Sequence, residues 1–234
     1  MLIIPTYNEH DNIAVLVGRI RKAVGNEPIL FVDDNSPDGT ADKIRRMQAS
    51  DPNIHLLPRP GKGGYGSACR DGIKKVLREN LAEYVIQSDA DLSHPPELLP
   101  RMIELLKTHP VVIGSRYVKG GGAQNWDIRR RCLSFGANFY ARWFTGVPVR
   151  DMTAGFVGYR TEVLRNINLD SIQSEGYAFL MEMKFNLHRS GARFCEFPII
   201  FYEREAGKSK FSRKILLEGM RFPLRAFGKR ISGA

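Results

Sequence analysis

Short apolar segments alternate with segments of helical spacing through the first half of the chain, and this alternation constrains the fold more than any other feature. The apolar segments have the length of buried strands, and they lie at residues 2–4, 28–32, 54–57, 84–88 and 111–114. Between the first two, apolar residues recur at helical spacing, at Ile13, Leu16, Val17 and Ile20. This order predicts an α/β protein with a single, mostly parallel sheet flanked by helices.

Local signals predict where several of these elements begin and end. Pro5 is expected to end the first strand, and the polar turn cluster at 33–39 to end the second. Thr40 is expected to be the N-cap of the following helix, and Pro96 to open a later one.

The second half of the chain is less regular. Its apolar spacing predicts helices at 129–144 and 179–188, a strand at 155–159 and an extended segment at 194–202. A basic amphipathic helix is expected near 212–228, with a kink at Pro223. No internal repeat or clear linker divides the sequence, which predicts a single domain over residues 1–234.

Polar clusters follow four of the predicted strands, at residues 5–9, 33–39, 89–94 and 115–119. Because parallel strands place their carboxyl ends at one edge of a sheet, these clusters are expected to meet there. Ligands of such sheets bind beyond that edge, so it is the candidate active site.

Two acidic pairs lie at these strand ends. Asp89 and Asp91 are suited to a hard divalent cation that also binds substrate phosphates, and the alternative is a solvated acidic turn. Asp33 and Asp34 suit hydrogen bonds to a ribose or base, although this stretch is also a good turn sequence. Both interpretations fit if Asp34 serves the ligand and residues 38–39 form the turn.

The positive charge is unevenly distributed along the chain. The formal net charge is +10; residues 1–115 carry 14 basic and 15 acidic side chains, and residues 116–234 carry 21 and 10. An excess of this kind indicates an anionic partner, which is a nucleic acid, a phosphorylated substrate or a membrane surface, or it serves only solubility.

Other totals exclude several classes of protein. A hydrophobic content of 43% and a charged content of 26% are typical of a globular chain. Three widely spaced cysteines argue against a disulfide framework or a clustered zinc site and favour a reducing compartment. The chain shows no signal peptide and no run of 18 apolar residues, so no membrane span is expected.

Several longer motifs occur in a fixed order. They are Pro5-Thr6-Tyr7-Asn8-Glu9, Val32-Asp33-Asp34-Asn35-Ser36-Pro37-Asp38-Gly39-Thr40, Asp89-Ala90-Asp91, His94-Pro95-Pro96-Glu97, Gly114-Ser115-Arg116-Tyr117, Trp126-Asp127, Gly136-Ala137-Asn138-Phe139, Asp151-Met152-Thr153-Ala154-Gly155-Phe156 and Gly207-Lys208-Ser209-Lys210. Together they resemble the family 2 glycosyltransferases of the nucleotide-diphosphosugar (GT-A) fold. Within that family the dolichol-phosphate (polyprenol-phosphate) mannose synthases are most similar, and the resemblance covers nearly the whole chain.

The resemblance implies a GDP-mannose donor and a bound Mg²⁺ or Mn²⁺. The donor-binding residues that it implies are Pro5, Tyr7, Glu9, Val32, Asp34, Asp89, Ala90, Asp91, Arg116, Arg204 and Lys210. The implied metal ligands are Asp89, Asp91 and Ser93; many members carry glutamine at the position of Ser93, whose hydroxyl is a shorter and weaker ligand. Arg204 and Lys210 are expected to reach the diphosphate from a loop that closes over the donor.

The resemblance also implies an acceptor-phosphate site formed by Arg116, Arg130 and Ser134. Arginine suits this role because its planar fork binds phosphate oxygens in pairs. Arg129 and Arg131 are expected to be solvated, because three successive arginines cannot all face one way on a helix.

The implied reaction is an inverting transfer of mannose to a polyprenol (dolichol-type) monophosphate. The phosphate oxygen is already ionised, so it needs no strong general base, and the protein must instead overcome repulsion between two anions. The residues expected to act in catalysis are Asp91, Arg116 and Arg130, whereas His94 is expected to be structural. The nearest alternative donor is UDP-glucose or another nucleotide sugar.

A polyprenol acceptor implies contact with a membrane surface. Residues 200–234 carry nine basic and three acidic side chains, with apolar residues between them. A helix of this kind lies on an anionic membrane or packs on the domain with its basic face in water. We expect peripheral attachment at the cytoplasmic face, directly or through a separate membrane-anchoring subunit.

Two other classes of protein are disfavoured. A Rossmann dehydrogenase needs Gly-x-Gly-x-x-Gly after the first strand, whereas the glycine-rich stretch at 61–66 follows the third and has a different spacing. Nucleic acid is not expected as a partner, because acidic strand ends would repel its phosphates and the basic residues lack an interleaved aromatic platform.

Overall fold

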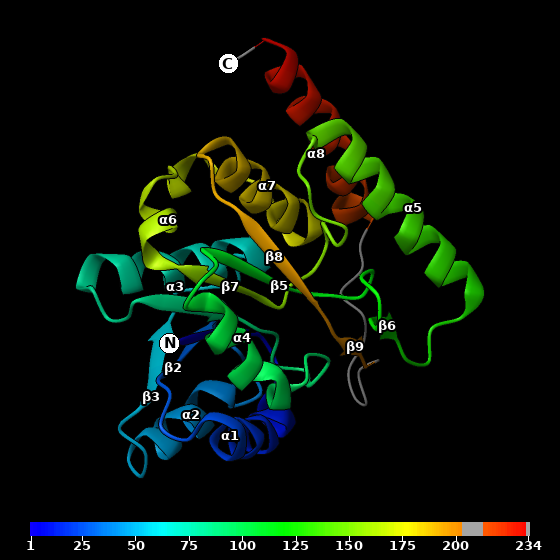
Figure 1. Cartoon of the computed structure of the whole chain (residues 1–234). Coiled ribbons are helices and arrows are strands. Elements are labelled where there is room, and N and C mark those ends of the chain that lie inside the picture. The colour runs from blue at the N-terminus through cyan, green and yellow to red at the C-terminus, as the bar shows by residue number, and fades with distance from the viewer. Residues whose placement is uncertain (203–212, 233–234) are drawn as a thin grey trace.

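The structure, a computed structural model, describes residues 1–202 and 213–232 (Figure 1). Seven strands form one sheet in the order β3-β2-β1-β4-β7-β5-β8. The strands are β1 (Leu2–Thr6), β2 (Ile29–Asp33), β3 (Ile54–Pro58), β4 (Tyr84–Gln87), β5 (Val111–Ser115), β7 (Val157–Arg160) and β8 (Phe194–Pro198). All run parallel to their neighbours except β7, which is antiparallel to β4 and β5. The expected mostly parallel sheet is therefore confirmed.

Helices cover both faces of this sheet, as expected (Figure 1). One face carries α1 (His10–Val24), α2 (Thr40–Gln48) and α4 (Leu99–Leu106). The other carries α3 (Tyr65–Glu79), α5 (Ile128–Thr145), α6 (Thr161–Arg165), α7 (Gly176–Arg189) and α8 (Arg213–Ser232). Short 3₁₀ helices lie at Pro96–Leu98 and Leu169–Ser171, and β6 (Gly122–Ala123) pairs in parallel with β9 (Ile200–Phe201).

β1 is longer than expected, because it continues through Pro5 to Thr6. Successive residues of a strand between two neighbours turn their N–H groups to opposite sides. The N–H of Leu2 donates to Pro28 on the β2 side, so the nitrogen of Pro5 faces β4. Pairing with β4 already ends at Ile3 and Gln87, so the strand tolerates a residue without an N–H at this point.

The predicted N-cap of α2 was wrong by one residue, because α2 begins at Thr40 and Gly39 precedes it. Asp38 replaces the expected cap by accepting hydrogen bonds from the backbone N–H and the hydroxyl of Thr40, at 3.0 and 2.6 Å. The buried Thr40 hydroxyl in turn accepts the N–H of Glu9 at 3.0 Å. These contacts fix the segment after β1 against the turn after β2.

The C-terminal helix both packs on the domain and exposes apolar side chains. α8 continues through Pro223 and buries Phe222 and Ala226 against the core, with Phe222 in an edge contact with Phe185 of α7. Within residues 1–202 and 213–232, no helix combines the length and the apolar character needed to cross a bilayer.

Candidate active site

The expected convergence of the polar strand ends is confirmed. β1, β2, β4 and β5 point in one direction, so the residues after them share one edge of the sheet. Since β7 is antiparallel, it brings its first residues, rather than its last, to the same edge. The segment 150–156, which leads into β7, therefore joins the site from the second half of the chain.

The acidic pair after β4 lies in a constrained turn. Asp91 is 6% exposed, and one of its carboxylate oxygens accepts the N–H of Ser93 at 3.1 Å. Leu92 has a φ of 62°, a conformation that is uncommon for a branched residue. Strain of this type is retained where a functional geometry requires it.

The chemistry of this turn fits a divalent cation held partly by its substrate. Ser93 is 1% exposed, and its buried hydroxyl oxygen has no hydrogen-bond partner in the described part of the chain. Within residues 1–202 and 213–232, no three side chains of His, Cys, Asp or Glu lie together as a metal-binding group. Two carboxylates and a hydroxyl, completed by phosphate oxygens and water, are the type of donor set that Mg²⁺ and Mn²⁺ accept.

Three side chains, those of Gln87, Tyr65 and His94, position Asp89. The amide of Gln87 donates to the hydroxyl of Tyr65 at 2.9 Å, and that hydroxyl is hydrogen-bonded to Asp89. Burial and the nearby carboxylate raise the pKa of Tyr65 well above its usual value, so the hydroxyl keeps its proton. Nδ1 of His94 accepts the N–H of Asp89 at 3.0 Å while its ring stacks on Phe156, consistent with the structural role expected for His94.

The glycine-rich loop before α3 is bound by carboxylates. Asp34 accepts the N–H groups of Gly63 and Gly64 at 3.2 and 2.8 Å, and its other oxygen pairs with Arg59. Glu175 accepts the N–H of Gly66 at 2.6 Å and that of Ser67 at 2.9 Å. Because these donors already bind acidic side chains, the loop is not arranged as a phosphate cradle, which further disfavours the dehydrogenase alternative.

The other residues expected to bind the sugar donor differ in their exposure at this edge of the sheet. Tyr7 is partly exposed and carries the ammonium group of Lys62 over its ring at 4.0 Å. Glu9 precedes α1 and accepts the side-chain amide of Asn12 at 2.8 Å. Pro5 pairs with Val32 in the sheet. The side chain of Val32 is fully buried in the core, so this side chain does not reach the surface of the site.

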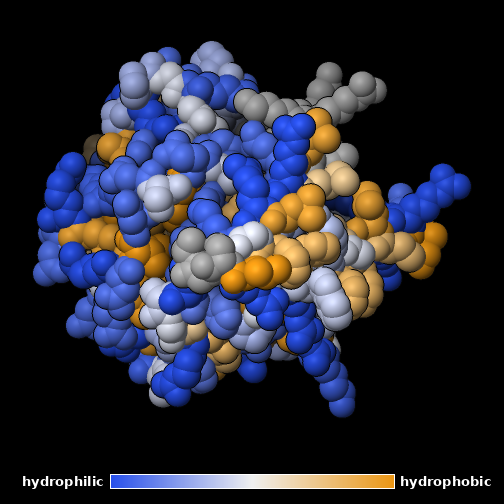
Figure 2. Space-filling view, turned by 90° about the horizontal axis from the view of Figure 1, so that it is seen from above, coloured by the Kyte–Doolittle hydropathy of each residue, from blue (hydrophilic) through white to orange (hydrophobic). Residues whose placement is uncertain are grey.

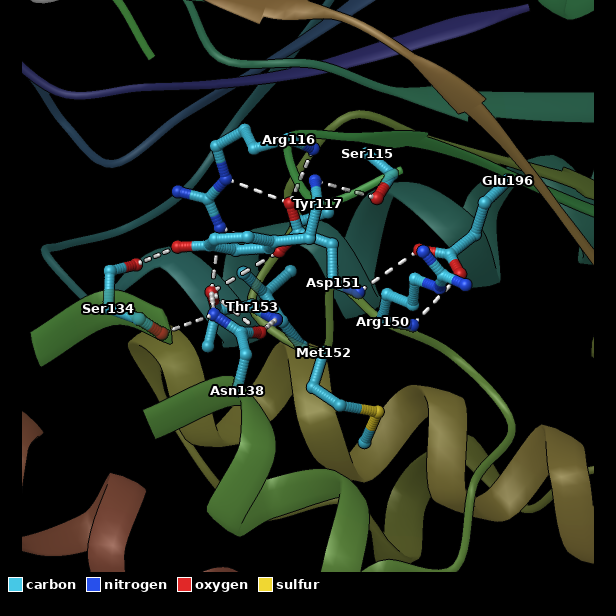
Figure 3. Close-up of polar contacts among 12 residues, drawn as sticks. Ser115, Arg116, Tyr117, Ser134, Asn138, Arg150, Asp151, Met152, Thr153 and Glu196 are labelled. Carbon is cyan, nitrogen blue, oxygen red and sulfur yellow. Dashed lines mark hydrogen bonds and ion pairs between the residues drawn. The ribbon is translucent and has the colours of Figure 1, made fainter. Parts of the chain in front are cut away.

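Arg116 and Asp151 form the most extensive polar contact of the site (Figure 3). Asp151 is fully buried and accepts the backbone N–H, Nε and Nη2 of Arg116 at 2.9, 2.8 and 2.7 Å. Burial alone would raise the pKa of Asp151, but the Arg116 charge and its hydrogen bonds lower it below the usual value. The pair thus holds a permanently charged guanidinium in a fixed direction at the strand end.

A hydrogen-bond network extends from this pair to α5 (Figure 3). Nη2 of Arg116 also donates to the hydroxyl of Thr153 at 2.8 Å. Asn138 accepts the N–H of Thr153 at 3.1 Å and donates to the carbonyl oxygen of Ser134 at 2.8 Å. The Ser134 hydroxyl accepts the hydroxyl of Tyr117 at 2.6 Å. The structure therefore brings Arg116 and Ser134 together, two of the three residues expected to bind the acceptor phosphate.

Arg130, the third of these residues, lies in the first turn of α5. Asp127 is the N-cap of this helix and accepts the N–H of Arg130 at 2.7 Å, while the guanidinium lies over the ring of Trp126 at 4.4 Å. Arg129 and Arg131 are exposed, as expected. Arg131 also donates to the carbonyl oxygen of Ala123 at 3.0 Å and lines a cavity of about 300 Å³ together with Arg116 and Trp126.

One aromatic side chain lies between the acidic and the basic parts of the site. The ring of Phe201 lies 5.9 Å from that of His94 and 5.6 Å from that of Trp126, and Arg116 lies over it at 5.6 Å. The N–H of the following residue, Tyr202, donates to the carbonyl oxygen of Ser93 at 3.3 Å. Arg204 and Lys210, both expected to bind the donor diphosphate, lie outside the described residues.

Lys184, for which the sequence predicted no role, is fully buried. Its ammonium group donates to the carbonyl oxygens of Met152, Ala154 and Leu180 at 3.1, 2.9 and 3.4 Å. The lysine thereby ties α7 to the segment that carries Asp151. A lysine within the apolar run at 179–185 was the signal that could have identified it.

Lys184→Met is expected to change how stability depends on pH. Burial lowers the pKa of Lys184 to about 7, which the charges of Asp151 and Glu196 only partly offset. Between pH 7 and 10 the unfolded chain therefore binds the additional proton, so this group makes the free energy of unfolding rise with pH, by at most about 1.4 kcal/mol per unit. Urea titrations at several pH values should give a flatter profile for the variant, and parallel profiles would contradict the assignment.

The sequence is similar to mannosyltransferases over nearly its whole length, and three of these relatives each match 94% of this chain. An undecaprenyl-phosphate mannosyltransferase of Micrococcus luteus is 43% identical over 220 residues, which cover 94% of this chain and 90% of the relative. A polyprenol monophosphomannose synthase of Mycolicibacterium smegmatis is 41% identical, covering 94% and 83%. A dolichol-phosphate mannosyltransferase of Pyrococcus furiosus is 36% identical, and the match spans 94% of this chain but only 61% of that protein.

Solved structures share the fold at low sequence identity. A glucosyl-3-phosphoglycerate synthase from Mycobacterium tuberculosis, solved with Mn²⁺, UDP and glucosyl-3-phosphoglycerate, gives a TM-score of 0.66 at 16% identity and covers 97% of this chain and 79% of its own. A mannosyl-3-phosphoglycerate synthase from Rubrobacter xylanophilus gives 0.66 at 18%, covering 99% and 73%. These likenesses confirm the expected GT-A fold.

The sequence family follows from a match over most of the chain. The family model described as glycosyl transferase family 2 matches residues 1–167, and the relatives above have names that agree with the motif resemblance. This chain therefore belongs to glycosyl transferase family 2 and is a glycosyltransferase.

Proposed function

We propose that this enzyme transfers mannose from GDP-mannose to a polyprenol monophosphate with inversion at the anomeric carbon. The observation that supports this most is that Phe201 contacts both His94, which is hydrogen-bonded to Asp89 of the acidic pair, and the fixed Arg116, at one edge of the sheet. The names of relatives 43% and 41% identical support the acceptor and the sugar. Both substrates carry phosphate groups. The donor diphosphate would bind through a metal ion held by the acidic pair, and the acceptor phosphate would bind to the neighbouring arginines.

The chain's own residues would act mainly on charge and orientation. Arg116 cannot lose its proton and is held by Asp151, so it is prepared to neutralise an acceptor phosphate without reorganising. Arg130 and Ser134 complete that site from the first turns of α5, where backbone N–H groups also favour an anion. The phosphate oxygen then attacks the anomeric carbon in line, and GDP leaves on the opposite side.

Asp89, Asp91 and Ser93 would hold Mg²⁺ or Mn²⁺ together with the donor diphosphate. When bound, the ion supplies charge stabilisation for the departing diphosphate. Mn²⁺ in the M. tuberculosis glucosyl-3-phosphoglycerate synthase structure supports such an ion in this fold. Arg204 and Lys210, outside the described residues, would add positive charge at the same phosphates.

The test of this function is identification of the product. Purified protein with Mg²⁺ or Mn²⁺ would be incubated with farnesyl phosphate and either GDP-mannose or UDP-glucose, and the lipid product identified by mass spectrometry. The proposal expects a mannosylated farnesyl phosphate whose formation stops with EDTA and resumes with excess Mg²⁺ or Mn²⁺. A glucosylated product alone would establish the alternative donor.

We further propose that α5 and α8 contact the membrane that contains the acceptor. α5 and α8 each expose a stripe of apolar residues on one side. Figure 2 shows apolar side chains gathered beside hydrophilic ones on the face of the molecule seen from above. The α5 stripe consists of Ile128, Phe135, Phe139 and Trp143, and the α8 stripe of Leu217, Met220, Leu224, Phe227 and Ile231. Apolar stripes flanked by arginine and lysine suit the surface of an anionic bilayer, at the cytoplasmic face if GDP-mannose is the donor.

Flotation with vesicles tests this contact. The protein is expected to float with vesicles of phosphatidylcholine and phosphatidylglycerol, and Phe139→Ser combined with Leu224→Ser to reduce the floating fraction several-fold. Val15→Ser removes a similarly exposed apolar side chain from α1 and serves as the matched control. Equal flotation of all three proteins would exclude these stripes, and no flotation of the unmodified protein would favour a separate anchoring subunit.

A further inference from the structure

Trp126 contacts both arginines of the proposed acceptor site. The guanidinium of Arg116, from the end of β5, lies over its indole ring at 5.4 Å, and that of Arg130, from the first turn of α5, at 4.4 Å. Phe201 packs edge-on against the same ring at 5.6 Å. A single side chain therefore fixes the relative position of two cations that come from different elements of the fold.

The polar atom of Trp126 lacks a protein partner. Its Nε1 is buried and has no hydrogen-bond acceptor within residues 1–202 and 213–232. Trp126 also lines the cavity of about 300 Å³ that Arg116 and Arg131 share. An indole N–H can only donate, and a buried donor without an acceptor is costly, so such a group calls for an acceptor from outside the chain, such as a ligand oxygen or an ordered water.

We infer that Trp126 is a fourth anion-binding residue of the acceptor site, beside Arg116, Arg130 and Ser134: its ring positions the two arginines, and its N–H donates to an oxygen of a phosphate monoester bound in this cavity. This inference rests on the proposed function for the identity of the acceptor. It adds a neutral donor to the two cations, and a neutral donor directs the phosphate without adding further charge. The Arg130 side chain, which lies over the ring, is exposed at the helix start.

Tryptophan fluorescence tests the binding directly. The chain has two tryptophans, so Trp143→Phe leaves Trp126 as the only reporter. Titration with farnesyl phosphate is expected to shift and saturate its emission, with farnesol as the control that lacks the phosphate. Inorganic phosphate should compete at higher concentration. An emission spectrum that farnesyl phosphate and farnesol leave equally unchanged would overturn the inference.

Two substitutions separate the ring from the N–H. Trp126→Phe keeps an aromatic ring and removes the donor, so the KM for farnesyl phosphate is expected to rise about tenfold, the effect of one hydrogen bond to a charged group. Trp126→Leu also removes the platform for both arginines, and the KM should rise a further several-fold. The KM for GDP-mannose should stay within about twofold in Trp126→Phe, which keeps the ring under Arg116, and a general structural defect would not produce this selectivity.

The outcomes distinguish this inference from the proposed function. If the unmodified enzyme transfers mannose but Trp126→Phe leaves the acceptor KM unchanged, the inference fails and the function stands. If no nucleotide sugar is transferred but the Trp126 emission responds to farnesyl phosphate and not to farnesol, the phosphate site stands and the proposed function fails. If Trp126→Leu unfolds, the fluorescence titration and Trp126→Phe still decide the question.

Discussion

Asp91→Ala is expected to abolish sugar transfer, lowering kcat/KM by roughly a thousandfold or more. Asp91 is almost fully buried in the turn after β4, next to a Ser93 hydroxyl without a partner among the described residues. Removing its carboxylate removes a ligand from the proposed cation, whose charge stabilisation is worth several kcal/mol. Each tenfold change in rate corresponds to about 1.4 kcal/mol.

This loss can be distinguished from unfolding and from a general charge effect. Calorimetry of GDP binding with and without Mn²⁺ should show that the variant has lost the metal-dependent part of the affinity. Asp11→Ala removes an exposed carboxylate from the first turn of α1 and should leave both affinity and turnover unchanged. Unimpaired turnover of Asp91→Ala would exclude the metal assignment.

Asp151→Asn is expected to destabilise the protein by about 3–5 kcal/mol, the usual cost of leaving one partner of a buried ion pair without its counter-charge. Asp151 is fully buried, and the Arg116 side chain is only 9% exposed. The substitution also removes the nearby charge of Asp151, which raises the pKa of the buried Lys184. Urea denaturation monitored by circular dichroism measures the change in the free energy of unfolding.

The matched control for Asp151→Asn is Asp42→Asn. Asp42 pairs with Arg45 on the surface of α2, where both side chains are more than half exposed. Exposed pairs contribute up to about 1 kcal/mol, so this variant should be nearly as stable as the unmodified protein. Equal destabilisation of the two variants would show that the buried pair does not carry the expected energy.

Periodicity was sufficient to predict the central sheet and its helices. The five apolar segments of the first half all became strands, because burial on both faces of a parallel sheet requires continuous apolar runs. The errors were at boundaries: Pro5 lies inside β1, and Thr40 opens α2 instead of capping it. Both depend on which neighbouring segment supplies a hydrogen-bond partner, and spacing along the chain does not contain that information.

The sequence also placed the chemistry of the strand ends correctly on one edge of the sheet. It did not reveal that the two oxygens of Asp34 are engaged by Arg59 and the glycine-rich loop, or that the Val32 side chain is buried. It also did not reveal that the exposed Arg131 lines the cavity beside Arg116. Helical spacing predicts which residues share a face, but the loop before α5 decides what that face contacts.

By itself, the sequence determined the α/β fold, the acidic strand ends and the family, because each follows from local patterns and motif order. Only the tertiary structure decided which groups act together. It paired Arg116 with Asp151, placed Trp126 against two arginines, and buried Lys184 beneath the segment that holds Asp151. The physical reason is that ion pairs, cation–π contacts and desolvation depend on distances of a few ångströms between segments far apart in the chain, and the antiparallel β7 is what brings those segments together.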